Sequence, residues 1–193
     1  ATPLLERAVE LDSTFALALS ALAESSGWHP AAGDMNRVRR LAWQYRDRLN
    51  PQDQAFLTLR LGSMYPRQTP WQVQIADAEK AAQTMPESAD AWYYLGDGLF
   101  HGGRLADIPD PEARARQAFE KAFELDSLYG GPITHLARLN FVTGDTAAQR
   151  LWTRRELALL SDGESVAQAK WDLLQSSADA AGITAFLAEL TSQ

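Results

Sequence analysis

The stretch SADAWYYLGDGLFHGG (residues 88–103) predicts a helix with two non-polar faces. Helical spacing places Trp92, Leu95, Gly96 and Leu99 together, which is typical of a packing face. The same spacing gathers a second group on another side of the helix, namely Tyr93, Asp97, Phe100 and His101. Because an ordinary surface helix is polar on its outer side, this pattern indicates a fold in which both faces of the helix make contacts.

Helical signals run along the whole chain, and strand signals are nearly absent. Residues 3–12 (PLLERAVELD) and 112–126 (EARARQAFEKAFELD) carry apolar side chains at i, i+3, i+4 and i+7. The triplet Asp110-Pro111-Glu112 predicts a helix start, with Asp110 as the N-cap and Pro111 in the first turn. The sequence therefore predicts an all-α fold.

The helices follow a period. A helix, a Ser or Pro break, a short turn and a second helix recur, with breaks at residues 13, 51, 86, 127 and 161. Successive breaks are 38, 35, 41 and 34 residues apart. A regular spacing of this size indicates a chain of repeated helix pairs.

The repeats resemble the tetratricopeptide repeat (TPR) family, whose unit is an antiparallel helix pair of about 34 residues. The best copy covers residues 91–127, and the residues that match the family's signature are Trp92, Leu95, Gly96, Leu99, Ala115, Phe119 and Ala122. The small residues Gly96 and Ala122 let paired helices approach closely. The turn HGGRLADIPDP (residues 101–111) is longer than the family's usual turn.

The resemblance implies an all-α, right-handed solenoid of antiparallel helix pairs. We expect one domain over residues 1–193, with about five degenerate repeats and a C-terminal capping helix within residues 177–193. The side chains expected to face inward from that last helix are Ile183, Phe186, Leu187 and Leu190. Such caps cover the exposed end of a repeat array.

The amino-acid sequence of the repeats is also similar to that of repeat regions appended to bacterial signalling proteins, namely serine/threonine kinases, nucleotide cyclases and transcriptional activators. The chain opens without Met and already inside a predicted helix. We therefore expect it to be a fragment of a longer protein, with a sensory or regulatory role.

In a stacked solenoid, the first helix of each pair lines a concave groove. The resemblance implies that this groove binds a protein or peptide segment. The residues that the spacing places there are Glu24, Thr58, Tyr65, Tyr93, Asp97, Phe100, His101, Thr134, Arg138 and Phe141. Carboxylates at Glu24 and Asp97 outnumber the single Arg138, which favours a basic or apolar segment. In the alternative interpretation, Phe100 and Phe141 pack under the long 102–111 insertion.

Composition excludes several classes of function. The net charge of −7 and the pI near 4.9 argue against direct nucleic-acid binding and against docking on an anionic membrane. The chain has no cysteine and no run that would span a membrane. No P-loop, nucleophile elbow or Gly-rich dinucleotide turn is present, so we expect neither an enzyme nor a cofactor. The histidines His29, His101 and His135 are isolated in sequence, and we expect no metal site or catalytic residue.

Two hypotheses remain. The first is a non-catalytic scaffold that binds a partner segment in the groove and regulates an attached signalling domain. The second is a structural repeat domain that packs on itself or on a sister domain and binds nothing in trans. The sequence leaves the partner, the compartment and the oligomeric state open, including a homo-oligomer.

Overall fold

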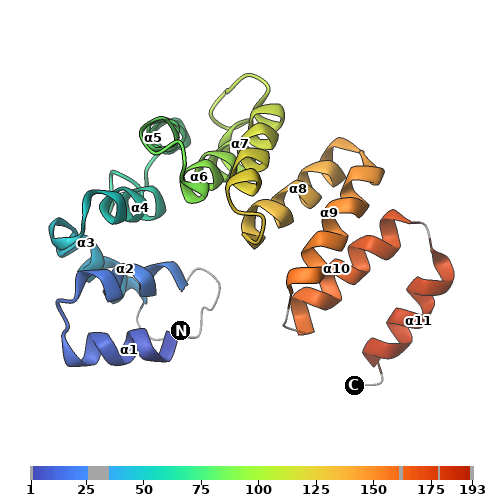
Figure 1. Cartoon of the computed structure of the whole chain (residues 1–193), viewed down its shortest axis with the longest axis horizontal. Helices are drawn as coiled ribbons and strands as arrows, with labels where there is room; N and C mark the ends of the chain where they lie inside the picture. Colours follow the sequence, from blue (N-terminus) through green and yellow to red (C-terminus); the bar gives the residue numbers. More distant parts are fainter. Residues whose placement is uncertain (1, 26–34, 161–162, 178, 192–193) are drawn as a thin grey trace. The chain divides into compact units, whose positions relative to one another are not determined.

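The computed structural model describes residues 2–25, 35–160, 163–177 and 179–191 (Figure 1). Throughout these residues the regular structure is helical, with no strand, so the predicted all-α fold is confirmed. The elements are α1 (Thr2–Leu11), α2 (Ala16–Ser25), α3 (Met35–Gln44), the 3-10 helix η1 (Arg46–Arg48), α4 (Pro51–Leu61), α5 (Trp71–Thr84), α6 (Ala89–Gly102), α7 (Pro111–Leu125), α8 (Gly130–Thr143), α9 (Thr146–Leu159), α10 (Gly163–Ser176) and α11 (Ala180–Thr191).

The predicted repeat breaks coincide with helix boundaries. Residues 13, 86 and 127 fall between helices, and residue 51 is the first residue of α4. The two Asp-Ser breaks use the same local chemistry, because Asp12 Oδ1 accepts from the backbone N–H of Thr14 at 2.8 Å and Asp126 Oδ1 accepts from that of Leu128 at 2.9 Å. The hydrogen bonds from Thr14 lower the pKa of Asp12. The break at residue 161 lies outside the described residues.

Contacts group the chain into two compact units, residues 1–81 and 82–193. In the first unit, α2 packs against α1, α3 and α4. Its core consists of Leu19, Ala23, Ala42 and Leu57, all nearly inaccessible to solvent.

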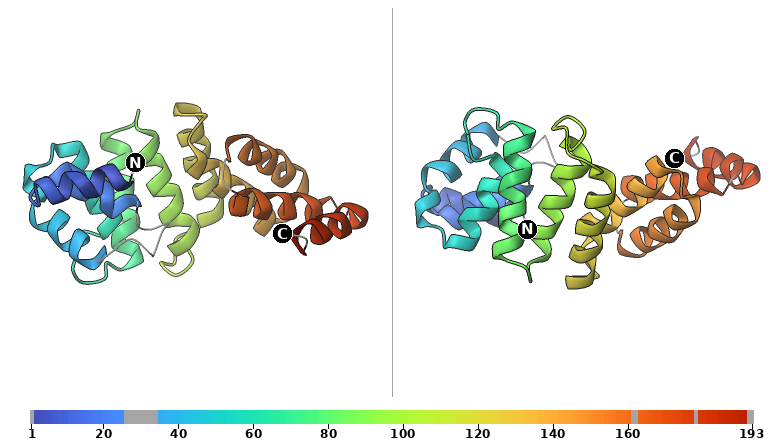
Figure 2. Two further views of the ribbon diagram at one scale, coloured as in Figure 1. Left: turned by 90° about the horizontal axis from the view of Figure 1, so that it is seen from below. Right: turned by 90° about the horizontal axis from the view of Figure 1, so that it is seen from above.

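In the second unit, each helix packs mainly on its neighbours in sequence. The α6–α7 and α8–α9 pairs make the most extensive contacts, and α8 also packs against α7 and α6. Both views in Figure 2 show α6 and α7, in green to yellow, side by side. Helix α10 packs on α9, and α11 packs on α10. This succession of helix pairs is the packing of a helical solenoid.

The predicted packing face of α6 is confirmed at three of its four residues. The Ser88 hydroxyl caps the helix by accepting from the Ala91 N–H, and Leu95, Gly96 and Leu99 are buried. Gly96 lies close against α7, since an added Cβ would lie 2.6 Å from two ring carbons of Phe119. Trp92 is only half-buried, and its indole N–H donates to the carbonyl of Pro86 at 2.8 Å.

The start of α7 differs in part from the prediction. Pro111 is the first helical residue, as expected, and Asp110 occupies the N-cap position. However, Asp110 adopts a left-handed conformation (φ 47°), and its side chain makes no capping hydrogen bond. The same turn holds a second residue with positive φ, Asp107, and its Arg104 pairs with Glu112 in the first turn of α7.

The C-terminal helix forms as predicted, as α11. Phe186 is 8% exposed, so it faces inward, and Ile183 is half-buried. Leu187 is 46% exposed, so the expectation that it faces inward is wrong. The main contact of α11 within the described residues is with α10. The side chain of Leu190 lies outside the described residues.

Among the described residues, no helix combines the length and the apolar character needed to cross a membrane.

Candidate functional site

The candidate site lies where α6 and α8 pack side by side in the second unit. Helix α6 contributes Tyr93, Asp97, Phe100 and His101, which share one side of the helix through their i, i+4, i+7 and i+8 spacing. Helix α8 contributes His135, Arg138, Phe141 and Val142. We call these eight residues the α6–α8 face.

The half-buried ring of Tyr93 lies between α6 and the start of α8. Its ring lies 5.1 Å from that of Tyr129 and 5.6 Å from that of His135, measured between centroids. Gly131 at the start of α8 makes room for it, because a Cβ there would come within 2.7 Å of the Tyr93 ring. Burial, and then the nearby carboxylate of Asp97, raise the pKa of the Tyr93 hydroxyl above its ordinary value. Tyr93 is half-buried and packs α6 against the start of α8, and its part in a partner-binding groove stays a prediction.

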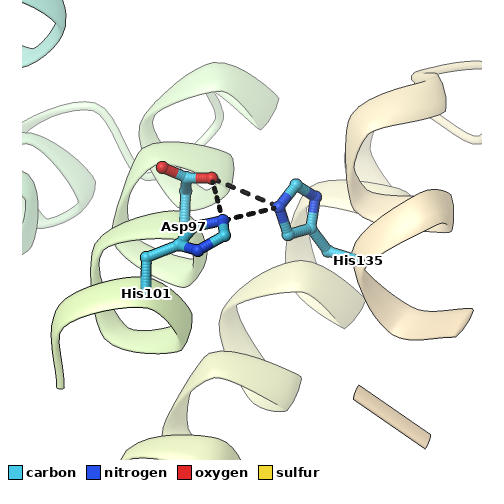
Figure 3. A group of neighbouring side chains, drawn as sticks. All are labelled: Asp97, His101 and His135. Atoms are coloured by element: carbon cyan, nitrogen blue, oxygen red, sulfur yellow. Dashed lines mark hydrogen bonds and ion pairs between the residues drawn. The ribbon is translucent and has the colours of Figure 1, made fainter. Parts of the chain in front are cut away.

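Three polar side chains, Asp97, His101 and His135, converge between α6 and α8 (Figure 3). Asp97 Oδ1 lies 3.2 Å from His135 Nε2 and 3.5 Å from His101 Nε2. The two Nε2 atoms are 3.4 Å apart. One carboxylate oxygen and two imidazole nitrogens thus form a compact triangle, with two corners on α6 and one on α8.

His135 is held rigidly in this arrangement. Its side chain is nearly buried (4% residue exposure), and the ring of Phe119 stacks on it with centroids 4.9 Å apart. Its Nδ1 lies 2.9 Å from the carbonyl oxygen of Gly131. Because a carbonyl oxygen only accepts, the hydrogen is on Nδ1, and in the neutral ring Nε2 carries a lone pair directed at Asp97 and His101.

The expectation that His101 and His135 are isolated is wrong. They are 34 residues apart in sequence, and the packing of α8 on α6 brings them together. Asp97 and His101, four residues apart on one helix, were the signal available in the sequence. The sequence did not predict that His135 joins them. Residues 94 and 135 each lie eight positions after a repeat break, at 86 and 127, so the repeat pattern pairs His135 with residue 94 rather than with Asp97.

The outer part of the α6–α8 face is exposed. Phe141 is 66% exposed, so it does not pack under the 102–111 insertion, and Val142 beside it is 58% exposed. Arg138, one turn earlier on α8, is also exposed. Phe100 is half-buried and its ring contacts those of His101 and His135 edge-on. Val142 was missed by the sequence prediction, although it lies four residues after Arg138.

Thr134 is engaged within the fold. Its hydroxyl donates to Glu156 Oε1 of α9 at 2.7 Å and ties α8 to α9. Thr134 nevertheless shares one side of α8 with Arg138 and Phe141 through its i, i+4, i+7 spacing.

The predicted groove residues of the first unit lie in three different segments: Glu24 in α2, Thr58 in α4 and Tyr65 in the loop after α4. Glu24 is exposed on α2 and forms an ion pair with Arg60 of α4 at 3.0 Å. Thr58 is half-buried, and its hydroxyl donates to the carbonyl of Gln54 one turn earlier. Tyr65 lies beyond the end of α4, in the following loop, where its ring packs 5.6 Å from that of Trp43. The structure brings Glu24 close to α4 but places Tyr65 off the helix on which it was expected.

Comparison with solved structures defines the class of fold. The helix pairs, their serial packing and the small residue between paired helices are those of a TPR-type helical-repeat protein. The chain is similar to PilW, described as a widely conserved type IV pilus biogenesis factor, with a TM-score of 0.60 and 14% identity over 98% of this chain and 82% of that chain. It is also similar to the MamA protein, with a TM-score of 0.53 and 11% identity over 89% of this chain and 87% of that chain.

These similarities concern the fold. No protein-family model and no curated protein sequence matches the chain.

Proposed function

We propose that the chain is a non-catalytic scaffold that binds a segment of a partner protein on the α6–α8 face. One observation carries the proposal. Phe141 and Val142 form an exposed apolar pair on α8, one turn after the exposed Arg138. Aromatic and arginine side chains are enriched among the residues that dominate binding energy, and adjacent exposed apolar side chains often mark interaction sites.

The chemistry of the face favours one kind of segment. An apolar side chain of the partner would remove Phe141 and Val142 from water, which is worth about 25 cal/mol per Å² of apolar surface buried. The net charge of −7 attracts basic partners at longer range, and this attraction weakens as salt increases. We therefore propose a basic segment with at least one large apolar side chain.

The regulatory part of the proposal rests on the resemblance to repeat regions of bacterial signalling proteins. Binding of the segment would then alter an attached signalling domain. The TPR-type fold supports the scaffold role, because such folds generally bind protein partners.

A quantitative capture experiment from source-cell lysate tests the proposal. The wild-type chain is compared with the double variant Phe141→Ser/Val142→Ser. Both side chains are exposed, so the variant should keep its circular dichroism spectrum and melting temperature. The expected result is a protein that the wild type captures and the variant loses.

Leu128→Ser is the matched control. Leu128 is 74% exposed but lies before the start of α8, whose first residue is about 16 Å from Phe141 along the helix axis. Loss of the same protein in both variants would indicate general apolar adhesion and would contradict the proposal. Capture of the chain's own full-length copy, lost in the double variant, would instead favour the self-association hypothesis.

A further inference from the structure

We propose that Asp97, His101 and His135 form a binding site for one divalent transition-metal ion, with zinc as the best match. The proposal concerns ion binding at the polar triangle and does not depend on the partner segment proposed above. It rests on the separation of the three ligand atoms, on the hydrogen bonding of His135 and on the chemistry of the donor set.

The triangle has the size of one face of a zinc tetrahedron. With zinc–ligand bonds of about 2.0–2.1 Å, the corners of a tetrahedron lie about 3.3–3.4 Å apart. The observed separations are 3.2, 3.4 and 3.5 Å. A face of an octahedron with similar bond lengths, as magnesium requires, has edges of only about 2.8–3.0 Å. The dimensions therefore favour tetrahedral over octahedral coordination.

The hydrogen bonding of His135 directs its Nε2 at the other two ligand atoms. His135 Nδ1–H donates to the Gly131 carbonyl, so the Nε2 of the neutral ring is a lone-pair donor. It faces Asp97 Oδ1, which also bears lone pairs, at 3.2 Å. Two lone-pair atoms repel at this distance unless a positive charge lies with them. A bound metal ion would supply this positive charge, and a bound proton is the alternative.

The surroundings match those of a metal ligand. Coordinating histidines usually donate their second ring nitrogen to a carbonyl or a carboxylate, which fixes the ring and its tautomer. The bond to Gly131 and the stacked Phe119 ring do this for His135. Two imidazoles and one carboxylate suit zinc and its neighbours in the transition series more than calcium or magnesium. His101 is exposed and Asp97 partly so, which leaves the fourth position open to water.

Titration calorimetry on the untagged, chelator-stripped full chain tests the proposal, with zinc chloride as the probe. The expected result is one equivalent of zinc bound by the wild type. His101→Ala and Asp97→Asn should each weaken that affinity by at least about tenfold, because losing even an outer-sphere partner of a metal ligand costs 10- to 100-fold. His29→Ala, which removes the remaining histidine, should leave the affinity unchanged. Equal affinity in all four proteins would overturn the proposal.

Two measurements on the wild type avoid any doubt about folding of the variants. Cobalt(II) in place of zinc should give the intense visible absorption of a tetrahedral site. Nuclear magnetic resonance of the imidazole nitrogens should show zinc shifting Nε2 of both His101 and His135 while Nδ1 of His135 keeps its hydrogen. If zinc shifts neither Nε2 resonance, a proton alone occupies the cluster and the proposal fails.

Discussion

At the scale of single residues, glycine decides how closely helices pack in the second unit. Gly96 faces the ring of Phe119, and Gly131 faces the ring of Tyr93. Both contacts join neighbouring helices, α6 to α7 and α8 to α6. The role of Gly96 was predictable from the repeat signature, whereas that of Gly131 depends on the position of Tyr93 across the helix boundary.

Gly96→Ala should lower the free energy of unfolding by about 1–3 kcal/mol, because the new Cβ overlaps a ring that is itself fully buried. Urea unfolding followed by circular dichroism measures the change. Gly130→Ala is the control, since its Cβ would meet nothing within 4 Å. We expect Gly130→Ala to leave the stability unchanged or raise it by up to about 1 kcal/mol. Equal losses in the two variants would contradict the packing role of Gly96.

Tyr93 makes the free energy of unfolding depend on pH in the alkaline range. Burial raises its pKa in the folded chain above the ordinary value of 10.0. Above that pH the unfolded chain loses the proton while the folded chain keeps it, so the free energy of unfolding falls as pH rises. Tyr93→Phe should make this fall shallower, as measured by urea unfolding at several pH values from 8 upward. A slope identical to that of the wild type would contradict the burial of the hydroxyl.

Only part of the polar triangle could be predicted from the sequence. Asp97 and His101 share a face through local helix geometry, which the sequence states directly. His135 joins them through the packing of α8 on α6, which brings together side chains 34 residues apart in sequence. This packing is tertiary and includes the close contact of Gly131 with Tyr93, so no local sequence pattern predicts it.

At the scale of helices, the repeat breaks were predictable because they use local turn chemistry. The side chains of Asp12 and Asp126 each cap a turn through a backbone N–H two residues on. The long turn before α7 was predictable in position but not in conformation. Asp107 and Asp110 both adopt positive φ there, and Asp110 consequently does not act as a side-chain cap.

The terminal helix α11 should stabilise the end of the array through one face. Phe186→Ala should lower the free energy of unfolding by about 3 kcal/mol, since Phe186 is buried, whereas Leu187→Ala should cost less than about 1 kcal/mol. A chain that ends at residue 180 should melt at a lower temperature than the full chain. Thermal unfolding followed by circular dichroism measures all three.

Equal effects of Phe186→Ala and Leu187→Ala would contradict the orientation of α11. An unchanged melting curve for the shortened chain would contradict its role as a cap.

At the scale of the whole molecule, the fold class followed from periodicity, because each helix pair repeats the same local pattern and packs on its neighbours. The division into two compact units was not predicted. The expectation of one repeat domain over residues 1–193 stays a prediction, as does the regulatory role. The exposed Phe141 and Val142 provide the most direct access to function, because their exposure does not serve the stability of the fold.

The central claim is that the α6–α8 face binds a partner protein. A photo-crosslinking amino acid placed at residue 141 in the source cell tests it most directly, with the same amino acid at residue 128 as the control. The account predicts a discrete adduct with a different protein from residue 141 and none from residue 128. Adducts of equal identity and yield from both positions, or no adduct from residue 141, would contradict it.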